Sequence, residues 1–259
     1  MENIKLESTH NTRDLSCLTT KDGYKIKANK LIRSGSLIRL TDNDIKILKE
    51  LGLQVVIDFR SEKEFVNKPD VKIENVEYIN LPALPKNNLK EDKNSHGDSN
   101  LLQLVDKKTG GKKFLMNTYK NLFLTKEGLS AYKEFFKIIL NGSDGAILWH
   151  CSQGKDRAGM AAFLLEYALG VSMEDCITDY LYTNVAMALK IKELTPIVLR
   201  LSNNDFSLLP YLREVFSADI DYLNKSLDSI KKHYKTLDNF IINILEVDIN
   251  KLKEMYLEK

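Results

Sequence analysis

The sequence predicts an α/β protein with a central, mainly parallel sheet of about four or five strands, flanked by helices and followed by a helical C-terminal extension. Three observations lead to this prediction. Continuous apolar runs at residues 53–59 and 146–151 are typical of strands buried on both faces. Segments with helical spacing of apolar residues alternate with these runs. Residues 173–259 consist almost entirely of helix-forming residues.

The first part of the chain predicts short extended pieces at residues 23–33 and then a helix. Thr41 is a good N-cap for this helix, with Asp44 three residues later, and Gly52 ends it. The first apolar run follows directly. Residues 76–81 predict a further strand, which is closed by prolines.

The middle of the chain begins with a polar stretch, residues 86–100, which we interpret as a mobile surface loop or an insertion. Residues 114–140 predict two helices with a break near residues 125–128. A turn at residues 141–145 then leads to the second apolar run.

The composition of residues 157–169 predicts a buried helix that ends at Gly170. In the extension we expect breaks at Pro196, at residues 203–205 and around Pro210. No repeat or linker divides the chain, so we expect a single domain, residues 1–259, with the extension starting near residue 171. We hypothesise that part of this extension forms a lid over the active site.

The overall composition is that of an ordinary folded protein. The 259 residues are 43% hydrophobic and 29% charged, which excludes a disordered chain. Lys and Arg total 38 against 36 for Asp and Glu, a balance that does not indicate nucleic-acid binding. No apolar run approaches the roughly 18 residues that a transmembrane helix needs. We expect a cytoplasmic protein, or a secreted one if a signal peptide has been removed.

The three cysteines, Cys17, Cys151 and Cys176, are widely spaced and form no C-x-x-C pair. They therefore indicate neither a disulfide framework nor a zinc site, and we expect no metal and no other cofactor. Cys17 and Cys176 are expected to be buried cysteines without a chemical role.

Cys151 lies in the segment H-C-S-Q-G-K-D-R-A-G, residues 150–159, between a predicted strand and a predicted helix. A loop of this length can turn its backbone N–H groups inward, and it leads into a helix N-terminus, so it can bind a phosphate dianion. The same groups and Arg157 would stabilise a thiolate at Cys151, which makes this cysteine a candidate nucleophile. The guanidinium of Arg157 can bind two phosphoryl oxygens.

The other residues of the segment have simpler expected roles. Gly154 allows the loop to turn, and His150 can orient the loop and favour the thiolate. The candidate phosphate-binding residues are Ser152, Gln153, Gly154, Lys155, Asp156 and Arg157.

This segment resembles the signature H-C-x-x-G-K-D-R-[TA]-G of the bacterial, cysteine-dependent tyrosine and dual-specificity protein phosphatases. Further short motifs of that family occur in order along nearly the whole chain: N-T-R-D-L at 11–15, L-I-R-S-G at 31–35, I-D-F-R-S at 57–61, and D-Y-L at 179–181 followed by Asn184.

The resemblance implies a metal-independent, two-step hydrolysis of phosphomonoesters through a phosphocysteine at Cys151, with Arg157 binding the phosphate. It also implies that Lys155 adds charge at the mouth of the pocket. Substrates in this family are proteins with phosphotyrosine, sometimes phosphoserine or phosphothreonine, and sometimes phosphoinositides. Residues expected to support or border the loop are Asn11, Arg13, Asp14, Asp58 and Arg60.

The chain departs from the family pattern at two positions. Ala158 replaces the Ser or Thr whose hydroxyl helps the cysteine to leave, so we expect slow breakdown of the phosphocysteine. No W-P-D segment supplies a general acid. Asp156 is our candidate, because a neighbouring dianion favours its protonated form. The rival candidates are Asp92, Asp98 and Asp106.

Three alternatives remain open at this stage. The same loop could serve a phosphoinositide or inositol-phosphate phosphatase. A rhodanese-like sulfurtransferase also has a reactive cysteine between a strand and a helix, but usually without the Gly-Lys-Asp-Arg-x-Gly ending. A non-catalytic, phosphate-binding pseudophosphatase usually lacks the cysteine or the arginine, and both are present here.

Overall fold

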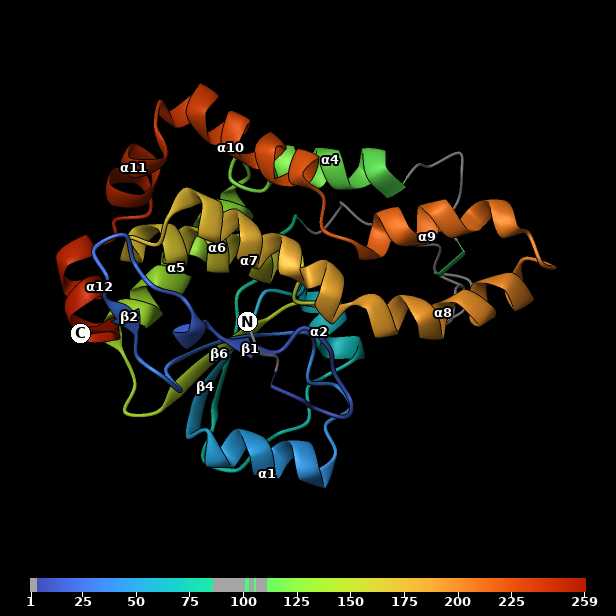
Figure 1. Cartoon of the computed structure of the whole chain (residues 1–259), viewed down its shortest axis with the longest axis horizontal. Helices are drawn as coiled ribbons and strands as arrows, with labels where there is room; N and C mark the ends of the chain where they lie inside the picture. The colour runs from blue at the N-terminus through green and yellow to red at the C-terminus, as the bar shows by residue number, and fades with distance from the viewer. Residues whose placement is uncertain (1–3, 86–100, 103–104, 106–110) are drawn as a thin grey trace.

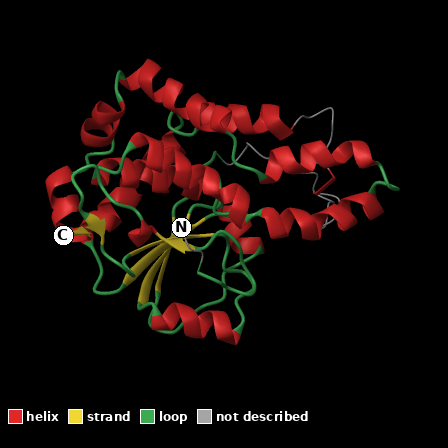
Figure 2. Cartoon of the chain, in the orientation of Figure 1, coloured by secondary structure: helices red, strands yellow, loops and turns green. Residues whose placement is uncertain are grey.

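The computed structural model describes residues 4–85, 101–102, 105 and 111–259. Its main sheet has five strands in the order β1-β3-β6-β4-β5 (Figures 1 and 2). All neighbouring pairs are parallel except β1 with β3. The predicted α/β fold is therefore confirmed. The strands are β1 Arg13–Asp14, β3 Leu31–Ser34, β4 Leu53–Asp58, β5 Glu77–Asn80 and β6 Ala146–His150.

Helices cover both faces of this sheet (Figure 1). On one face, α1 (Asp42–Glu50) packs over β4 through a small apolar cluster that includes Leu48 and Val56. Its N-cap is Thr41, which forms a capping box with Asp44 as predicted. On the other face lie α5 (Lys126–Asn141) and α6 (Arg157–Leu169), within the main core. All residues of β6 are buried, which explains its uninterrupted apolar sequence.

The helices of the middle segment agree with the prediction. Helix α4 (Gly111–Asn121) and α5 are separate, and the N-cap Thr125 accounts for the break between them. The polar stretch at residues 86–100 lies outside the described residues. One helix, α2 (Glu62–Asn67), was not predicted because it contains few apolar residues. Its capping box, Ser61 with Glu64, was the sequence signal for it.

The C-terminal part is helical, as expected, but Pro196 does not break it. This proline lies inside α8 (Ala188–Leu201), where the packing of Val198 and its neighbours outweighs the lost backbone hydrogen bond. The expected break at residues 203–205 is present, and Pro210 lies in the first turn of the next helix. The other elements of this part are α7 Met173–Ala186, η2 Phe206–Leu208, α9 Leu209–Phe216, α10 Ile220–Tyr234, α11 Leu237–Asn239, η3 Phe240–Ile244 and α12 Ile249–Tyr256.

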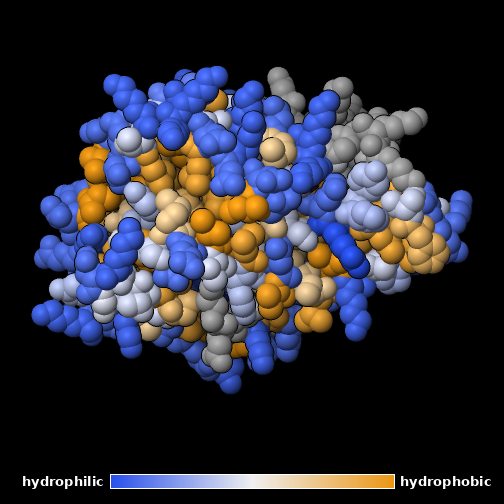
Figure 3. Space-filling view, turned by 45° about the horizontal axis from the view of Figure 1, so that its top comes forward, coloured by the Kyte–Doolittle hydropathy of each residue, from blue (hydrophilic) through white to orange (hydrophobic). Residues whose placement is uncertain are grey.

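Helices α8 and α9 form a layer of their own. They share an apolar cluster, with Val198 and Leu212 buried in it, that is separate from the main core. Side chains on α10 and α12 pack in the main core instead. Figure 3 shows hydrophobic atoms among hydrophilic ones at the right-hand end of the molecule, where α8 and α9 lie. Leu189 and Phe206 are about two thirds exposed, at 64% and 65%.

The last strand of the chain pairs with an early strand in a second, two-stranded sheet. Strand β2 (Lys25–Ile26) pairs antiparallel with β7 (Leu257–Glu258). A short 3-10 helix, η1 (Leu15–Cys17), connects β1 to this region. Among the described helices, none has both the length and the apolar character required to cross a membrane.

Candidate active site

Three strand ends meet at one edge of the sheet. Strand β6 lies between β3 and β4, and His150 at its end is in register with Ser34 on one side and Asp58 on the other. Because these strands are parallel, the segments that follow them surround the loop at residues 151–156. This loop connects β6 to α6, whose first residue is Arg157.

Four successive carbonyl groups of this loop accept hydrogen bonds from residues outside it. The donor and acceptor pairs are Ser36 N to Ser152 O (3.4 Å), Asn11 Nδ2 to Gln153 O (3.2 Å), Arg33 Nε to Gly154 O (2.9 Å) and Arg33 Nη2 to Lys155 O (3.4 Å). Within a trans peptide the carbonyl and the following N–H point in opposite directions. With the carbonyls held outside, the N–H groups of the loop therefore face its interior.

These N–H groups are available to a ligand. Among the described residues, none of the backbone N–H groups from Ser152 to Arg157 donates a hydrogen bond to the chain. The first N–H groups of α6 add to them, because the first turn of a helix has no intrahelical acceptors. Converging N–H groups at a helix N-terminus bind anions.

Two glycines make this arrangement possible. Gly154 has φ of +66°, and a Cβ atom there would lie 2.4 Å from the carbonyl oxygen of Ser34. At Gly159 a Cβ atom would lie 2.7 Å from Nη2 of Arg33. Any side chain would therefore separate the loop from the end of β3 or from the guanidinium that holds its carbonyls.

The three cysteines differ in their surroundings. Cys151 begins the loop and is 2% exposed. Cys176 is fully buried, and burial, together with the nearby Glu166 and Asp179, raises the pKa of its thiol. Cys17 is exposed, so the expectation that it is buried was wrong. Its position in η1 at the surface explains the difference.

Arg157 is held in place by Glu64 of α2. Nη1 donates to Oε2 (2.8 Å) and Nη2 to Oε1 (3.2 Å) of Glu64, while Nη2 also donates to Oγ of Ser152 (2.9 Å). Burial opposes the charge of Arg157, but Glu64 and Cys151 outweigh it and raise the pKa of the guanidinium. Burial likewise opposes the charge of Glu64, yet Arg157 holds the pKa of that carboxyl below its ordinary value. Glu64 thus fixes the guanidinium as a charged fork beside the loop.

The side chain of Lys155 does not lie where it was predicted. Its side chain is 1% exposed, and Nζ donates to the carbonyls of Val215 (2.6 Å) and Ser217 (3.1 Å) at the end of α9. The expected charge at the pocket mouth is therefore absent in this structure. Lys155 instead connects the loop to α9, because the last carbonyls of a helix attract a cation.

Asp156 lies at the end of a chain of hydroxyl groups. Tyr119 of α4 donates to Oδ1 of Asp156 (2.7 Å), and Tyr180 of α7 donates to the Tyr119 hydroxyl (2.9 Å). Burial and the Asp156 carboxylate raise the pKa of Tyr119 well above its ordinary value, so this phenol remains a donor. The side chain of Asp156 is 23% exposed, and its Oδ1 also lies 3.3 Å from Nζ of Lys155. The rival candidates Asp92, Asp98 and Asp106 lie outside the described residues.

A buried ion-pair network supports the loop from behind. Asp179 of α7 pairs with Arg13 (2.7 Å) and with Arg33 (2.8 Å), and all three side chains are inaccessible to solvent or nearly so. Arg13 also donates to Oδ1 of Asn11, whose amide holds the Gln153 carbonyl. Asn11 and Arg13 therefore lie where they were predicted, behind the loop.

Asp14 does not lie at the loop. Its carboxylate accepts hydrogen bonds from the backbone N–H groups of Ser16 (2.9 Å) and Asn29 (2.6 Å). It is the N-cap of η1, and Asp is favoured at such positions because its side chain accepts from the backbone. The prediction that it supports the loop was therefore wrong.

Comparison with known protein families assigns the chain to one of them. The model described as the tyrosine phosphatase family matches residues 4–258. The chain belongs to the tyrosine phosphatase family. It is a phosphatase, which agrees with the resemblance of residues 150–159 and of the shorter motifs.

Two curated relatives carry phosphatase names. One from Cupriavidus necator, named as a tyrosine-protein phosphatase, is 28% identical over 258 residues, 98% of this chain and 88% of the relative. The triple specificity protein phosphatase PtpB of Mycobacterium tuberculosis is 24% identical over 197 residues, 70% and 68% of the two chains. Among solved structures, the P. aeruginosa protein TpbA in complex with pTyr covers 96% of this phosphatase and 95% of its own chain, at 12% identity and a TM-score of 0.31.

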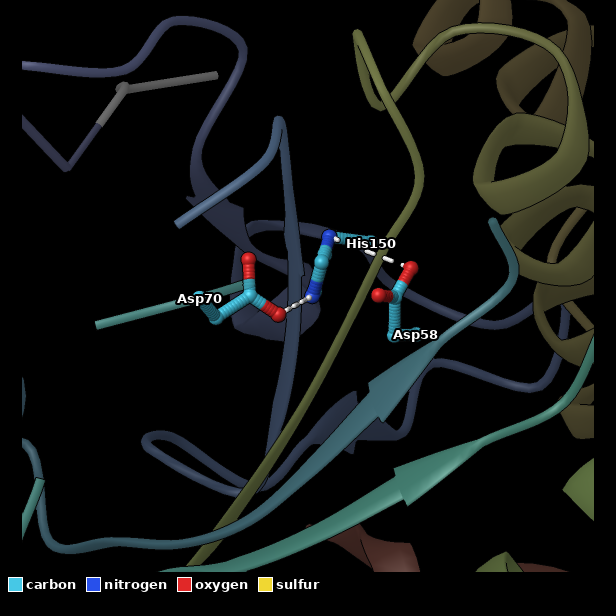
Figure 4. Close-up of side chains that lie close together, drawn as sticks. All are labelled: Asp58, Asp70 and His150. Carbon is cyan, nitrogen blue, oxygen red and sulfur yellow. Dashed lines mark ion pairs between the residues drawn. The ribbon is translucent and has the colours of Figure 1, made fainter. Parts of the chain in front are cut away.

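The phosphatase loop is bordered by a second buried cluster, around His150 (Figure 4). Arg60 donates to both carboxylate oxygens of Asp58, and its Nη2 donates to Oδ1 of Asp70 (2.9 Å). Nε2 of His150 lies 3.0 Å from Oδ2 of Asp70. Asp58 and Arg60 therefore lie beside the loop as predicted. Asp70 was not predicted, because the connection between α2 and β5 carries no recognisable motif.

The close arrangement of the side chains in this cluster can be explained without a metal ion. One ligand atom each from Asp58, Asp70 and His150 lies within 4.8 Å of the others, close enough to bind a cation. However, Arg60 already donates hydrogen bonds to both carboxylates, and the Leu37 backbone N–H also donates to Asp70. We therefore interpret these residues as an ion-pair network that supports the phosphatase loop.

Proposed function

We propose that this phosphatase hydrolyses phosphomonoesters through a phosphocysteine at Cys151, without a metal ion. The observation that supports this proposal most is the set of loop N–H groups turned inward beside Cys151 and Arg157. These donors can bind the three equatorial oxygens as their charge develops, which is the role that a metal ion has in other phosphatases.

Two steps follow from this arrangement. In the first, the thiolate of Cys151 attacks phosphorus, the bond to the leaving oxygen breaks, and Asp156 gives its proton to that oxygen. In the second, a water molecule attacks phosphorus, the S–P bond breaks, and Asp156 takes the proton of the water. Cys151 and Asp156 thus return to their initial states, and inorganic phosphate leaves.

We propose phosphotyrosine proteins as the main substrates, on the basis of the family and the names of its relatives. Phosphoserine and phosphothreonine proteins and phosphoinositides are the alternatives. A panel of phosphopeptides and phosphoinositides, assayed in EDTA, tests both points. Turnover of phosphotyrosine peptides in EDTA supports the proposal. Activity that needs an added divalent cation, or turnover of phosphoinositides alone, would contradict it.

The role of Asp156 gives a prediction for the substitution Asp156→Asn. Asparagine can still accept the hydrogen bond from Tyr119, but it has no proton to give. We expect hydrolysis of phenyl phosphate, which has a poor leaving group, to fall by roughly 10²- to 10³-fold. Hydrolysis of p-nitrophenyl phosphate should fall much less, because its leaving group needs little protonation. Steady-state kinetics with both esters measures the difference.

Asp98→Asn is the matched comparison for this prediction. It removes a rival candidate for the general acid and should leave both esters unaffected. If Asp98→Asn slows phenyl phosphate hydrolysis and Asp156→Asn does not, the general acid is not Asp156.

We also propose that the chain acts as one domain in which α8 and α9 form a lid over Cys151. Lys155 connects the loop to the end of α9 by hydrogen bonds, and Cys151 is almost inaccessible to solvent in this arrangement. Such a lid should protect the thiolate from oxidation.

Loosening the lid should therefore expose Cys151 to peroxide. Val198→Asp places a charge at a fully buried position in the α8–α9 cluster, whereas Leu189→Asp changes a residue of the same helix that is 64% exposed. We expect hydrogen peroxide to inactivate Val198→Asp several-fold faster than the wild type and Leu189→Asp at the wild-type rate. Equal rates for both variants, with circular dichroism showing intact folds, would rule out a protective lid.

A further inference from the structure

The two oxygens of the Asp156 carboxyl have different surroundings. Tyr119 of α4 donates a hydrogen bond to Oδ1 (2.7 Å), and Nζ of Lys155 lies 3.3 Å from the same oxygen. In the part of the chain that the structure describes, no group donates a hydrogen bond to Oδ2. Oδ1 is therefore held by the protein, whereas Oδ2 is left for a ligand.

A second phenol determines where the hydrogen of Tyr119 points. Tyr180 of α7 donates its hydroxyl hydrogen to the oxygen of Tyr119 (2.9 Å). A phenol has one hydrogen to give, so Tyr119 gives its own to Asp156. Burial raises the pKa of Tyr119 well above its ordinary value, which keeps this hydrogen in place. Oδ1 of Asp156 is thus an acceptor, and a proton that this carboxyl carries must be on Oδ2.

The Tyr119 side chain is fixed by its neighbours. It is 1% exposed, and its ring stacks on Tyr222 of α10 (5.5 Å between centroids) and meets the ring of Tyr180 edge to face (6.4 Å). Ser226 of α10 donates to the backbone carbonyl of Tyr119 (2.6 Å). Helices α4 and α10 lie side by side (Figure 1). The phenol is therefore held next to Asp156 by α7 and α10 as well as by its own helix.

We propose that Tyr119 is a positioning residue for the general acid: it binds Oδ1 of Asp156, so that Oδ2 gives the proton to the leaving oxygen and later takes the proton of the water. This inference rests on the proposed function, because it assigns a role within the same two steps. Without the Tyr119 hydroxyl, the proton could be on either oxygen, and a part of the molecules would present the wrong one to the substrate. Tyr119 acts only through Asp156.

Tyr119→Phe removes the hydroxyl and keeps the ring. Tyr180 still has an acceptor, because its hydroxyl also lies 3.4 Å from the carbonyl oxygen of Asp219, so the variant is expected to fold. The kcat/KM for phenyl phosphate reports the first step, in which the leaving oxygen takes the proton, and it should fall about tenfold. The kcat/KM for p-nitrophenyl phosphate should change less than about twofold, because its leaving group needs little protonation.

A double-mutant cycle with Asp156→Asn separates positioning from structural damage. Asparagine has no proton to give, so Tyr119→Phe should not lower the kcat/KM for phenyl phosphate any further in that background. Tyr256→Phe is the matched control, since Tyr256 of α12 is buried and its hydroxyl donates to the carbonyl of Ile139 (2.7 Å). It should leave both esters unaffected. An equal loss from Tyr119→Phe in the wild type and in Asp156→Asn overturns the inference.

Tyr180→Phe covers the case that Tyr119→Phe does not fold. It keeps the Tyr119 hydroxyl but removes the hydrogen bond that directs it, so phenyl phosphate hydrolysis should slow several-fold more than p-nitrophenyl phosphate hydrolysis. Equal changes for the two esters overturn the inference.

The failure of this inference is distinguishable from the failure of the proposed function. If Asp156→Asn slows phenyl phosphate selectively and neither tyrosine variant does, the inference is wrong and the proposed function stands. If Asp156→Asn has no selective effect, Asp156 is not the general acid and the proposed function itself is wrong at that step.

Discussion

Cys151→Ser is expected to abolish hydrolysis of p-nitrophenyl phosphate, to below roughly one part in 10⁵ of the wild-type kcat. A serine hydroxyl in this loop has the same position as the thiol but is not ionised at neutral pH. The loop N–H groups and Arg157 remain, so the variant should still bind phosphate. Steady-state kinetics and phosphate binding measured on the same preparation test both parts of the expectation.

The matched control for this variant is Cys176→Ser. Cys176 is fully buried on α7, and the pKa of its thiol is raised, so it cannot supply a thiolate at neutral pH. Its substitution should leave kcat unchanged. Substantial activity in Cys151→Ser would show that another group is the nucleophile.

Arg157→Lys is expected to lower kcat/KM by about 10³-fold. Lysine retains a positive charge opposite Glu64, so that carboxylate is not left buried and unpaired. It cannot, however, bind two phosphoryl oxygens at once while it holds Glu64 and Ser152. The loss should be larger in kcat than in KM, because the planar fork fits the spread oxygens of the transition state best.

Arg39→Lys makes the same change at an exposed position and should have no effect. If Arg157→Lys keeps kcat and only raises KM, then Arg157 binds the ground state and the transition state equally. A group other than Arg157 would then have to stabilise the charge that develops in the transition state.

The parts of the fold that depend on local sequence could be predicted. The apolar runs of β4 and β6, the Thr41 cap and the break near residues 125–128 placed those elements correctly. The strand-loop-helix arrangement around Cys151 is also local, since one short segment contains it. Pro196 was misjudged because tertiary packing determines whether a helix continues through a proline.

The contacts that position the site could not be predicted from spacing along the chain, because they join residues that are far apart in the sequence. Glu64 lies 93 residues from Arg157, and Arg13 lies 166 residues from Asp179. The direction of the Lys155 side chain depends on where α9 ends in space, and spacing along the sequence does not give that. A single sequence shows which side chains can take part in catalysis, but its spacing does not show which other side chains hold them in position.

The central claim is that phosphate passes through the sulfur of Cys151, and trapping the intermediate tests it most directly. Ala158 is fully buried and offers no hydroxyl to assist the cysteine as it leaves, so the phosphocysteine should accumulate during turnover. The measurement is rapid quenching of the wild-type enzyme with p-nitrophenyl phosphate, followed by mass spectrometry of its peptides. We expect the added phosphate on the peptide that contains Cys151, formed as fast as the burst of p-nitrophenol. Phosphate on a different residue, or no enzyme-bound phosphate during a measurable burst, would contradict the account.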